Sequence, residues 1–478
     1  MTSNQGYSRR WEILAFTSVG AFMTPLDGSI LSVALPVMSQ QLGLSFEGTL
    51  WVQAAYLLTM SVLLIPLGRL ADQWGCFRFY LIGIALFTLG SLGAAMSIGS
   101  TSIILSRVLQ GCGGAILSPT STALVTAVFP TNERGKAMGI NIGSVFVGLS
   151  IGPPLGGFLV DALSWHWIFL INIPIGIAVL LWGWHLRRVV PESRIEHKPD
   201  MLGSILLGLA IIALLLPLTL HVQWGWTSAQ TLASFAVSII SFTTFILLER
   251  NIPEPLIDLR LRRNRGFAFG NVASLLSHVA TFGVALLTSV WLQLVQGLPA
   301  KYAGWIMLGQ PVVQSMLSPV TGRLSDRIDV RFLTCLGMSM IALGMLLLAF
   351  FAQGANLAAI VASLAVVGIG MASFSAPNGS SIMGSVERHQ LVFAGAFYGT
   401  IRSVGMTFSV AILGGLAASH LGLGGWQALL KYGPGGHGAE AFAWGYRMAM
   451  LTGAAFALLG AFVACLTKPR AIRPATAD

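Results

Sequence analysis

Residues 139–157 read Gly-Ile-Asn-Ile-Gly-Ser-Val-Phe-Val-Gly-Leu-Ser-Ile-Gly-Pro-Pro-Leu-Gly-Gly and contain no charged side chain, so this stretch can lie in hydrocarbon. Four glycines follow one another at spacings of nine, four and four residues: Gly139, Gly148, Gly152 and Gly156. We expect them to form a stripe without side chains along one helix face, which a neighbouring membrane helix can approach closely. Pro153 lacks a backbone N–H and is expected to bend the helix there. A tight crossing in an ordinary membrane bundle is the simpler interpretation.

The composition of the chain indicates a membrane protein. Of its 478 residues, 55% are hydrophobic and 9% are charged, and the mean hydropathy is +0.78. A soluble protein of this length would carry about 25% charged residues. We therefore predict an all-α polytopic membrane protein. The four cysteines are scattered in or beside apolar stretches, and their spacing indicates neither a disulfide framework nor a metal site.

Windows of about 20 apolar residues mark membrane-spanning helices. Fourteen such windows are predicted, at 11–36, 48–68, 78–98, 101–123, 138–160, 165–185, 201–221, 231–249, 267–292, 302–322, 331–352, 357–380, 393–415 and 445–466. We expect residues 1–190 to form a six-helix N-terminal bundle, residues 191–255 an inserted helix pair, and residues 256–478 a six-helix C-terminal bundle.

Two motifs recur along the chain. Gly68–Asp72 (Gly-Arg-Leu-Ala-Asp) ends the second predicted span, and Gly322–Asp326 (Gly-Arg-Leu-Ser-Asp) ends the tenth, 254 residues later. Likewise Gly111-Cys112-Gly113, followed by a proline, is echoed by Gly368-Ile369-Gly370, also followed by a proline. Such a repeat implies two parallel halves of six helices with a cavity between them. The seventh and eighth predicted helices have no counterpart in the repeat.

The formal charge of +10 is unevenly distributed. If the N-terminus is inside, all but five of the 27 Lys and Arg residues fall on the inner side. The exceptions are Lys301, Lys431 and Arg447 outside, and Arg107 and Arg402 within spans. This is the positive-inside pattern, which predicts that both termini are cytoplasmic and argues against a nucleic-acid-binding surface.

Three charged side chains lie deep inside predicted spans, away from their ends: Asp27, Arg107 and Arg402. At a rise of about 1.5 Å per residue, Asp27 lies ~13 Å and Arg107 ~9 Å below the outer ends of their helices. We interpret Asp27 as a carboxylate whose proton affinity changes as Arg107 approaches or leaves. A static ion pair that fixes the bundle is the alternative. Arg402 is expected to be a buried charge that attracts an anionic substrate group, pairs with carbonyls at a helix break, or is purely structural.

Several stretches resemble motifs of the 14-span drug/proton antiporter family within the major facilitator superfamily, whose fifth helix carries an antiporter motif similar to Gly139–Gly157. The others are Leu26–Pro36, Arg107–Ala115, Trp165–Gly176, Pro255–Leu261, and Arg402 with Val404-Gly405 and Val410-Ala411. They extend from the first to the thirteenth predicted helix and are specific for the family, but they say little about the substrate. The resemblance implies a major facilitator fold, no cofactor, and export against a proton gradient by alternating access.

The resemblance also implies residues for gating and helix packing. They are Gly68, Asp72 and Arg78 in the inner loop after the second helix, Asp326 in its repeat, the glycine stripe, Pro153 and Gly157. In that inner loop Gln73, Cys76 and Phe77 replace basic residues of the superfamily pattern. Fewer cations are therefore present for the charge and helix-dipole contacts that hold the cytoplasmic face closed in the family. Asp72 as a simple helix cap is the alternative. We expect Gly148, Gly152 and Gly156 to let a helix of the second half, the tenth by resemblance, pack against the fifth helix when the protein faces inward.

Few features of the sequence indicate how a substrate is recognised. Residues that could line an apolar cavity with a few polar groups are Trp51, Gln53, Tyr56, Gln110, Trp305, Met307, Gln310, Gln314, Phe374 and Asn378. Each of them alone is more often a packing residue. The tenth predicted helix carries glutamines but no acid, so it lacks a second carboxylate for dicationic compounds. His420 and His437 in the Gly-rich outer segment 416–444 are weak evidence for a metal, and we expect none.

The chain contains no nucleotide-binding loop and no catalytic triad, so we expect neither an enzyme nor a cofactor. Our hypothesis is a proton antiporter that exports small amphipathic drugs or toxic compounds across a bacterial-type cytoplasmic membrane. Its partners would be substrate, protons and the lipid bilayer, and a periplasmic adaptor subunit is left open. A dedicated exporter of one metabolite or antibiotic is one alternative, and a transport-dead sensor or assembly partner is another. Asp27, Arg107 and the glycine stripe argue against the second alternative.

Overall fold

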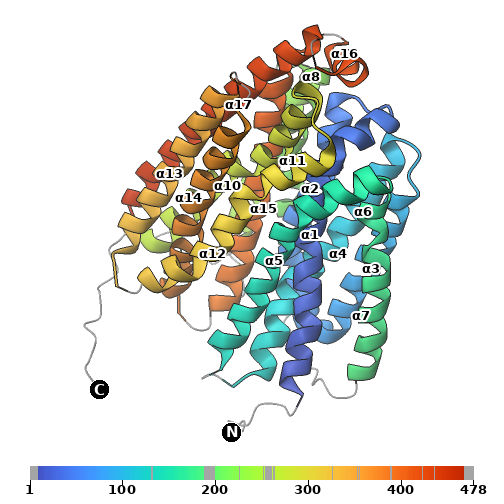
Figure 1. The fold of residues 1–478 in the computed structure, drawn as a ribbon. Helices are drawn as coiled ribbons and strands as arrows, with labels where there is room; N and C mark the ends of the chain where they lie inside the picture. The colour runs from blue at the N-terminus through green and yellow to red at the C-terminus, as the bar shows by residue number, and fades with distance from the viewer. Residues whose placement is uncertain are drawn as a thin grey trace. The chain divides into compact units, whose positions relative to one another are not determined.

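The computed structural model describes residues 9–130, 133–187, 200–225, 227–250, 252, 261, 264–325, 327–352, 354, 356–387, 390–422, 424–434 and 436–467. These residues form α-helices and one π-helical turn, and no strand occurs among them (Figure 1). The chain divides into two compact units. Unit 1 comprises Met1–Leu256 with Gly297–Trp305, and unit 2 comprises Ile257–Gln296 with Ile306–Asp478.

Unit 1 contains α1 (Arg10–Gln41), α2 (Phe46–Trp74), α3 (Cys76–Ala95), α4 (Ser100–Val128), α5 (Arg134–Ala162), α6 (Trp167–Leu170), α7 (Asn172–Leu186), α8 (Met201–Trp224), α9 (Ala229–Glu249) and most of α11 (Ala300–Met307). Unit 2 contains α10 (Arg265–Val290) with the π-helical turn η2 (Trp291–Val295), α12 (Gly309–Leu324), α13 (Val330–Phe351), α14 (Leu357–Gly384), α15 (Leu391–Ala418), α16 (Gly425–Tyr432) and α17 (His437–Cys465).

Twelve helices of the described residues are long and apolar enough to span a membrane, and they match twelve of the predicted windows. The other two windows fall on α8, whose apolar stretch Leu202–Leu218 is shorter, and on α11–α12. There the predicted single helix is interrupted at Leu308. Pro311 follows in the first turn of α12, where its missing N–H is tolerated. Fourteen spans therefore stay a prediction.

Polar caps fix where several helices begin. The Ser45 side chain accepts the backbone N–H three residues later at 3.0 Å, ahead of α2. The Asn356 side chain does the same at 3.1 Å ahead of α14. These oxygens satisfy backbone donors that the first turn of a helix leaves without a partner.

The repeated glycines of the sequence have equivalent packing in the two units. In unit 1, a Cβ at Gly111 would touch α2, and a Cβ at Gly113 would touch α3. In unit 2, a Cβ at Gly368 would touch α12, and one at Gly370 would touch α13. Each Gly-x-Gly pair thus lets one helix, α4 or α14, approach two neighbours at once. The sequence repeat is therefore a repeat of helix packing.

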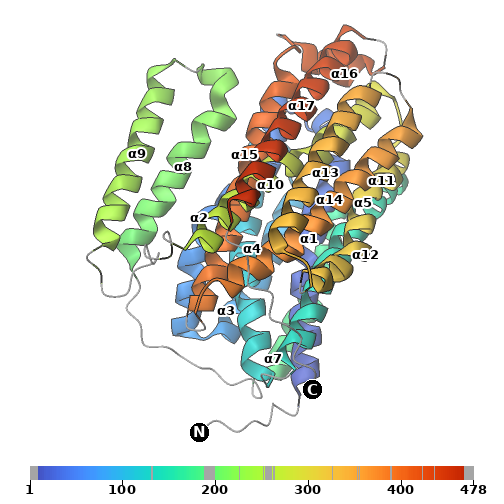
Figure 2. The ribbon, with the colours of Figure 1, turned by 90° about the vertical axis from the view of Figure 1, so that its left-hand side faces the viewer.

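Helices α8 and α9 form a hairpin beside α2, all in unit 1 (Figure 2). Ser238 on α9 donates a hydrogen bond from Oγ to the carbonyl oxygen of Ala210 on α8, at 2.9 Å. Gly208 on α8 meets the side chain of Val62 on α2, since a Cβ there would lie 2.9 Å from Val62 Cγ1. The hairpin is the helix pair that the sequence assigned to 191–255 as an insertion, an assignment that stays a prediction.

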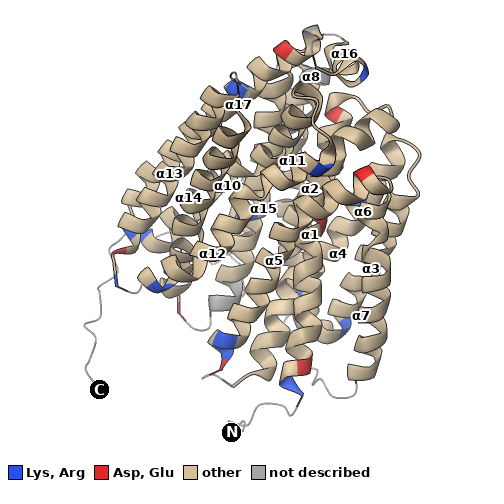
Figure 3. Ribbon diagram, viewed as in Figure 1, with Lys and Arg blue, Asp and Glu red and all other residues tan. Residues whose placement is uncertain are grey.

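Charged contacts gather at one end of unit 1, near the N-terminus (Figure 3). Arg10 at the start of α1 forms a 3.1 Å ion pair with Glu133, which precedes α5. Lys136 of α5 lies 5.3 Å from the ring centroid of Trp11. Both basic residues were predicted to be cytoplasmic. The structure brings them to the same end of the unit, and the assignment of that end to the cytoplasm stays a prediction.

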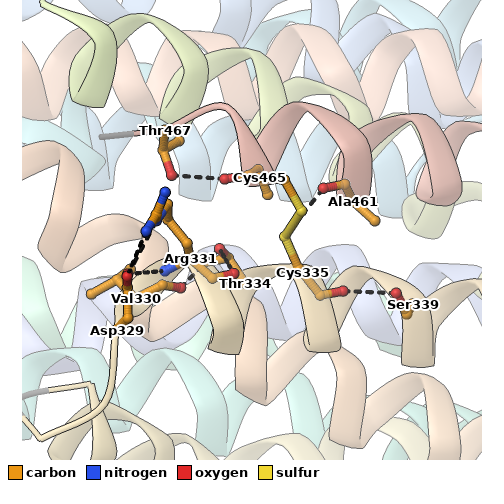
Figure 4. Close-up of a disulfide and its surroundings, with 10 residues drawn as sticks. Asp329, Val330, Arg331, Thr334, Cys335, Ser339, Ala461, Cys465 and Thr467 are labelled. Atoms are coloured by element: carbon orange, nitrogen blue, oxygen red, sulfur yellow. Dashed lines mark hydrogen bonds and ion pairs between the residues drawn. A yellow bond between two sulfur atoms is a disulfide. The ribbon is translucent and has the colours of Figure 1, made fainter. Parts of the chain in front are cut away.

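Cys335 on α13 and Cys465 on α17 are joined in a disulfide within unit 2 (Figure 4). Their Cα atoms are 6.2 Å apart. The prediction of unpaired cysteines was therefore wrong for these two. A separation of 130 residues carries no sign of the pairing, because only the packing of α13 against α17 brings the side chains together. Cys76 and Cys112 do not take part in a disulfide.

Asp329 caps α13 beside this disulfide (Figure 4). Its Oδ1 accepts the backbone N–H of Arg331 at 3.0 Å, and its Oδ2 accepts the Arg331 Nη2 donor at 3.0 Å. Burial raises the pKa of Asp329, but the side-chain and backbone hydrogen bonds from Arg331 and its positive charge outweigh burial. The pKa of Asp329 is therefore held below its ordinary value.

Candidate functional site

The centre of unit 1 holds a buried acid–base pair. Asp27 on α1 is 2% exposed, and Arg107 on α4 is fully buried. Arg107 Nη1 donates to Asp27 Oδ2 at 2.5 Å. A charge in such a setting is strongly unfavourable unless it is paired and hydrogen-bonded. The structure thus brings together the two side chains that the sequence placed at similar depth.

Three further contacts fix the guanidinium of Arg107. Its Nε donates to the carbonyl oxygen of Val52 on α2 at 3.0 Å, and its Nη1 also donates to Gln110 Oε1 at 2.6 Å. Its Cζ lies 4.6 Å from the ring centroid of Tyr56, within range of a cation–π interaction. Arg107 Nη2 has no hydrogen-bond partner among the described residues. The cation is therefore anchored to α2 and α4, and Asp27 reaches it from α1.

Two amides complete the shell around Asp27 Oδ1. Gln110 Nε2 donates to it at 3.0 Å, and Asn172 Nδ2, at the start of α7, donates at 3.1 Å. Gln110 was predicted to line a substrate cavity, but it is fully buried in this shell instead. Because depth along a helix does not reveal which way a side chain points, the sequence alone could not make that distinction.

Asn172 is a site residue that the sequence analysis did not single out. It lies within the motif Trp165–Gly176 and is fully buried. An amide in an otherwise apolar span was the available signal, because a buried polar group needs a partner. Its partner could not be named without the packing of α7 beside α1.

The glycine stripe of α5 faces α1, the helix that bears Asp27. A Cβ at Gly148 would lie 2.6 Å from the carbonyl oxygen of Phe22, and one at Gly156 would lie 2.9 Å from that of Ile30. A Cβ at Gly152, between them, would overlap the α1 side chain at position 29. Only glycine allows the two backbones to come this close.

Two expectations for the stripe were wrong. It packs on α1 of the same unit and not on a helix of the second half. Gly139 is not part of it, since a Cβ there would meet nothing within 4 Å. The physical reason is the nine-residue spacing to Gly148, which is two and a half helical turns and reverses the face.

The C-terminal end of α5 has a different neighbour within unit 1. A Cβ at Gly157 would lie 2.8 Å from Lys301 Cα, and a Cβ at Gly304 would lie 3.2 Å from Pro154 Cα. The backbone N–H of Lys301 also donates to Asp161 Oδ2 at 2.8 Å. Gly157 and the proline pair, rather than the stripe, therefore contact the start of the tenth predicted helix.

Arg402 on α15 is exposed, so its prediction as a buried charge was wrong. Thr400 and Ser403 beside it are buried, and a Cβ at Gly405 would lie 3.0 Å from His278 Cβ on α10. Helix α15 thus packs on α10 through the face that carries Gly405. The exposed cation lies eight residues inside the span that begins at Ala394.

The predicted cavity residues of unit 2 divide between packed and accessible positions. Phe374 is fully buried, and its Cβ would lie 3.0 Å from a Cβ at Gly337 on α13. Asn378 is buried and donates from Nδ2 to the carbonyl oxygen of Gly270 at 3.0 Å. Neither lines an open cavity. Gln310 is half-buried and Gln314 is 8% exposed.

The other predicted cavity residues also differ in exposure. Gln53 and Tyr56 on α2 are buried, and Trp51 is half-buried. Trp305 is exposed, whereas Met307 is buried. Tyr56 belongs to the shell of the acid–base pair, because its ring lies under the guanidinium.

The predicted gating residues are only partly described. Gly68 lies where α2 meets α4, since a Cβ there would be 3.6 Å from Pro119 Cβ. Arg78 is exposed on α3. The side chain of Asp72 and the whole of Asp326 lie outside the described residues. Their gating roles stay predictions.

No group of three or more His, Cys, Asp or Glu residues that could hold a metal occurs among the described residues. His420 Nδ1 shares a 2.8 Å hydrogen bond with Ser419 Oγ, and its ring lies 3.8 Å from that of Trp444. The side chain of His437 lies outside the described part of the chain. His420 thus has a local packing role.

A repeated helix-packing pattern and a buried acid–base pair in an apolar bundle define a polytopic membrane transporter. The chain belongs to the Major Facilitator Superfamily, whose family model matches residues 17–259 and 270–477. Members of this family are transporters, not enzymes, and generally need no cofactor.

Curated relatives include two proteins at about 30% identity. The chain is 30% identical over 416 residues to the riboflavin transporter RibZ of Clostridioides difficile (strain 630), covering 86% of this chain and 89% of that one. It is 34% identical over 412 residues to the multidrug resistance protein Stp of Mycobacterium tuberculosis (strain CDC 1551 / Oshkosh), covering 85% and 76%.

Solved structures share the fold at lower identity. A bacterial homologue of the human lysosomal transporter Spinster, in an inward-facing and unoccupied conformation, matches with a TM-score of 0.70 and 15% identity, over 96% of this chain and 97% of that chain. The peptide transporter POT in complex with sulfate matches with a TM-score of 0.66 and 16% identity, over 96% of both chains.

Proposed function

We propose that this protein is a proton-coupled antiporter that exports amphipathic drugs or toxic compounds across the cytoplasmic membrane. The observation that carries the proposal is the buried pair of Asp27 and Arg107, whose carboxylate is a proton acceptor inside an apolar bundle. The multidrug resistance relative supports the substrate class. Export against a concentration gradient needs an energy source, and an ion gradient can provide it in a chain without a nucleotide-binding loop.

Protonation of Asp27 is the step that couples the gradient to transport. The ionised carboxylate attracts Arg107 by charge, and the neutral acid does not. Uptake of a proton therefore weakens the main polar connection between α1 and α4. A proton that interacts differently with two conformations shifts the balance between them, which is what alternating access requires. Substrate and proton are then carried in opposite directions.

The membrane topology is part of the proposal. We infer fourteen spans, with α8 and the α11–α12 pair crossing in addition to the twelve apolar helices. The charged end of unit 1 at Arg10 and Glu133 would face the cytoplasm, and both termini with it. Helices α8 and α9 would form an inserted pair between two six-helix bundles. An accessory periplasmic adaptor subunit is compatible with this topology but nothing in the chain requires it.

A dedicated exporter of one metabolite is the second candidate, and the riboflavin transporter relative favours it. A susceptibility panel separates the two. A pump-deficient bacterial host is challenged with chemically diverse toxic compounds, with and without this protein. Raised tolerance to several unrelated amphipathic compounds is the expected result. Tolerance to a single compound, or export of riboflavin alone, would favour the dedicated exporter.

Antiport itself is tested in proteoliposomes loaded with a pH-sensitive dye. Addition of a compound found in the panel should move protons across the membrane in the direction opposite to the compound. Transport of the compound without any proton movement would refute proton coupling.

A further inference from the structure

The two amides around Asp27 differ in how firmly they are held. Gln110 Oε1 accepts from Arg107 Nη1 at 2.6 Å, and its Nε2 donates both to Asp27 and to Ser91 Oγ, the latter at 2.7 Å. Both ends of this amide are therefore engaged. A half-turn rotation of the Gln110 amide would place its oxygen against the two acceptors, Asp27 and Ser91, and its NH₂ group against the Arg107 cation. The orientation of this amide is therefore fixed.

Asn172 has only one end engaged. Its Nδ2 donates to Asp27 Oδ1 at 3.1 Å, while its Oδ1 is buried and has no hydrogen-bond partner among the described residues. The oxygen and nitrogen of an amide have nearly the same size and shape, so rotation about Cβ–Cγ exchanges them within the same space. No existing hydrogen bond of Oδ1 opposes that rotation.

A protonated Asp27 needs a hydrogen-bond acceptor for its O–H group, and its present neighbours do not provide one. An ionised carboxylate only accepts hydrogen bonds, whereas a carboxylic acid also has an O–H group to donate. Within the described part of the chain, the atoms that hydrogen-bond to the carboxylate are all donors: Arg107 Nη1, Gln110 Nε2 and Asn172 Nδ2. The guanidinium has no acceptor, and Gln110 presents its Nε2 to Asp27, not its Oε1, in the orientation that its bonds to Arg107 and Ser91 fix. A buried O–H without an acceptor is strongly disfavoured.

We propose that Asn172 is a two-way positioning residue, which donates from Nδ2 to the ionised Asp27 and, after its amide turns, accepts the O–H of the protonated Asp27 at its Oδ1. The proton is taken from water and bonds to a carboxylate oxygen, and Asn172 itself gains and loses none. This inference deepens the proposed function and rests on it for the claim that Asp27 takes up a proton in the transport cycle.

Few other ionisable groups face this site. Arg107 on α4 and Tyr56 on α2 interact with Asp27, and the Tyr56 hydroxyl lies towards Gly114 of α4, where a Cβ would be 2.7 Å from it. Helix α6 has no ionisable residue. The ionisable groups of the other described helices packed on α1 lie near helix ends: Arg134, Lys136 and Asp161 on α5, His185 on α7, and Cys76, Arg78 and Tyr80 on α3. The hydroxyl of Tyr80 donates to α1 at Phe16 and Thr17, away from Asp27.

Infrared difference spectroscopy tests the proposal directly. Spectra of the purified protein in lipid, recorded between pH 5 and pH 9, contain the C=O band of any carboxyl group that takes up a proton. The Asp27 band is identified by its loss in Asp27→Asn. We expect Asn172→Leu to shift this band to higher frequency, because the acid loses its hydrogen-bond acceptor. Asn172→Ser keeps one hydroxyl and is expected to shift the band less, which provides a milder variant if the leucine variant does not fold.

Asn141→Leu is the matched control. Asn141 is another buried asparagine of unit 1, and its Nδ2 donates to Ser121 Oγ at 3.1 Å, away from Asp27. This variant should leave the band in place. An Asp27 band at the wild-type position in both Asn172 variants would overturn the proposal, as would an Asp27 that never gains a proton in this range. The measurement needs no transport, so a failure of proton-driven export would count against the proposed function alone.

Discussion

Substitution of Gly152 by alanine adds one methyl group where α5 approaches α1. The added Cβ would overlap the Ser29 side chain and lie 3.0 Å from the backbone nitrogen of Ile30. The Ser29 hydroxyl can rotate away, but the backbone of α1 must move by a few tenths of an ångström. Asp27 lies on the same turn of α1, so the displacement is transmitted to its 2.5 Å contact with Arg107.

The expected magnitude follows from the contact. Overpacking of this kind costs about 1–3 kcal/mol, whereas alanine in place of glycine at an uncrowded helix position stabilises by about 0.5–1 kcal/mol. Gly139 provides the matched control, because it lies on the same helix and a Cβ there would meet nothing within 4 Å. At ~2 °C per kcal/mol for a unit of this size, Gly152→Ala should melt roughly 2–6 °C below the wild type, and Gly139→Ala should not melt below it.

The assay is thermal unfolding of the purified protein in detergent, followed by tryptophan fluorescence, with efflux measured in parallel. Gly148→Ala should be destabilising as well, because its Cβ would lie 2.6 Å from a backbone oxygen that cannot rotate away. Ser29→Ala in the Gly152→Ala background should restore part of the loss, since it removes the overlapping hydroxyl. Equal melting temperatures for Gly152→Ala and Gly139→Ala would refute the reasoning.

Three further predictions concern charged residues. Arg107→Ala should shift the pH optimum of transport upward, because Asp27 loses the cation that favours its ionised form, and an unchanged pH profile would make Arg107 purely structural. Arg402→Gln should weaken export of anionic compounds selectively, because an exposed cation inside a span is suited to attract them, whereas uniform loss across substrate charges would reject that role. Asp329→Asn should lower the unfolding temperature at neutral pH, and this effect should fade as the pH falls below about 4 and through the lowered pKa of Asp329, because the carboxyl stabilises the folded state only while it is ionised; the same loss at neutral pH and well below the lowered pKa would contradict this.

Local features could be predicted from the sequence because they depend on neighbouring residues. Apolar windows located helices such as α1 and α5, and the recurring Gly-x-Gly pairs indicated a repeat that the packing of α4 and α14 reproduces. The ends were less well defined, since α1 continues to Gln41, beyond its apolar window at 11–36. The break at Leu308 was missed although Gly309 and Pro311 follow it, because an apolar window averages hydropathy over about 20 residues and does not register single helix-breaking residues.

The site could be predicted only as far as depth along a helix allows. A fixed rise per residue placed Asp27 and Arg107 at similar depth, and the structure joins them. Depth does not give the direction of a side chain, so Gln110 was assigned to the cavity and Arg402 to the interior. The contact of Asn172 with Asp27 arises from helices 145 residues apart in the chain, which no local pattern reveals.

The central claim is that Asp27 couples proton movement to export. Asp27→Asn keeps the size of the side chain and removes its ionisable group, and Asp161→Asn, at the exposed end of α5, is the matched control. Efflux in proteoliposomes is driven by an imposed pH gradient, after each variant is shown to be folded by size-exclusion chromatography and thermal unfolding. If Asp27 carries the coupled proton, Asp27→Asn abolishes gradient-driven efflux while Asp161→Asn retains it. Wild-type efflux in a folded Asp27→Asn protein would show that the coupled proton does not bind Asp27.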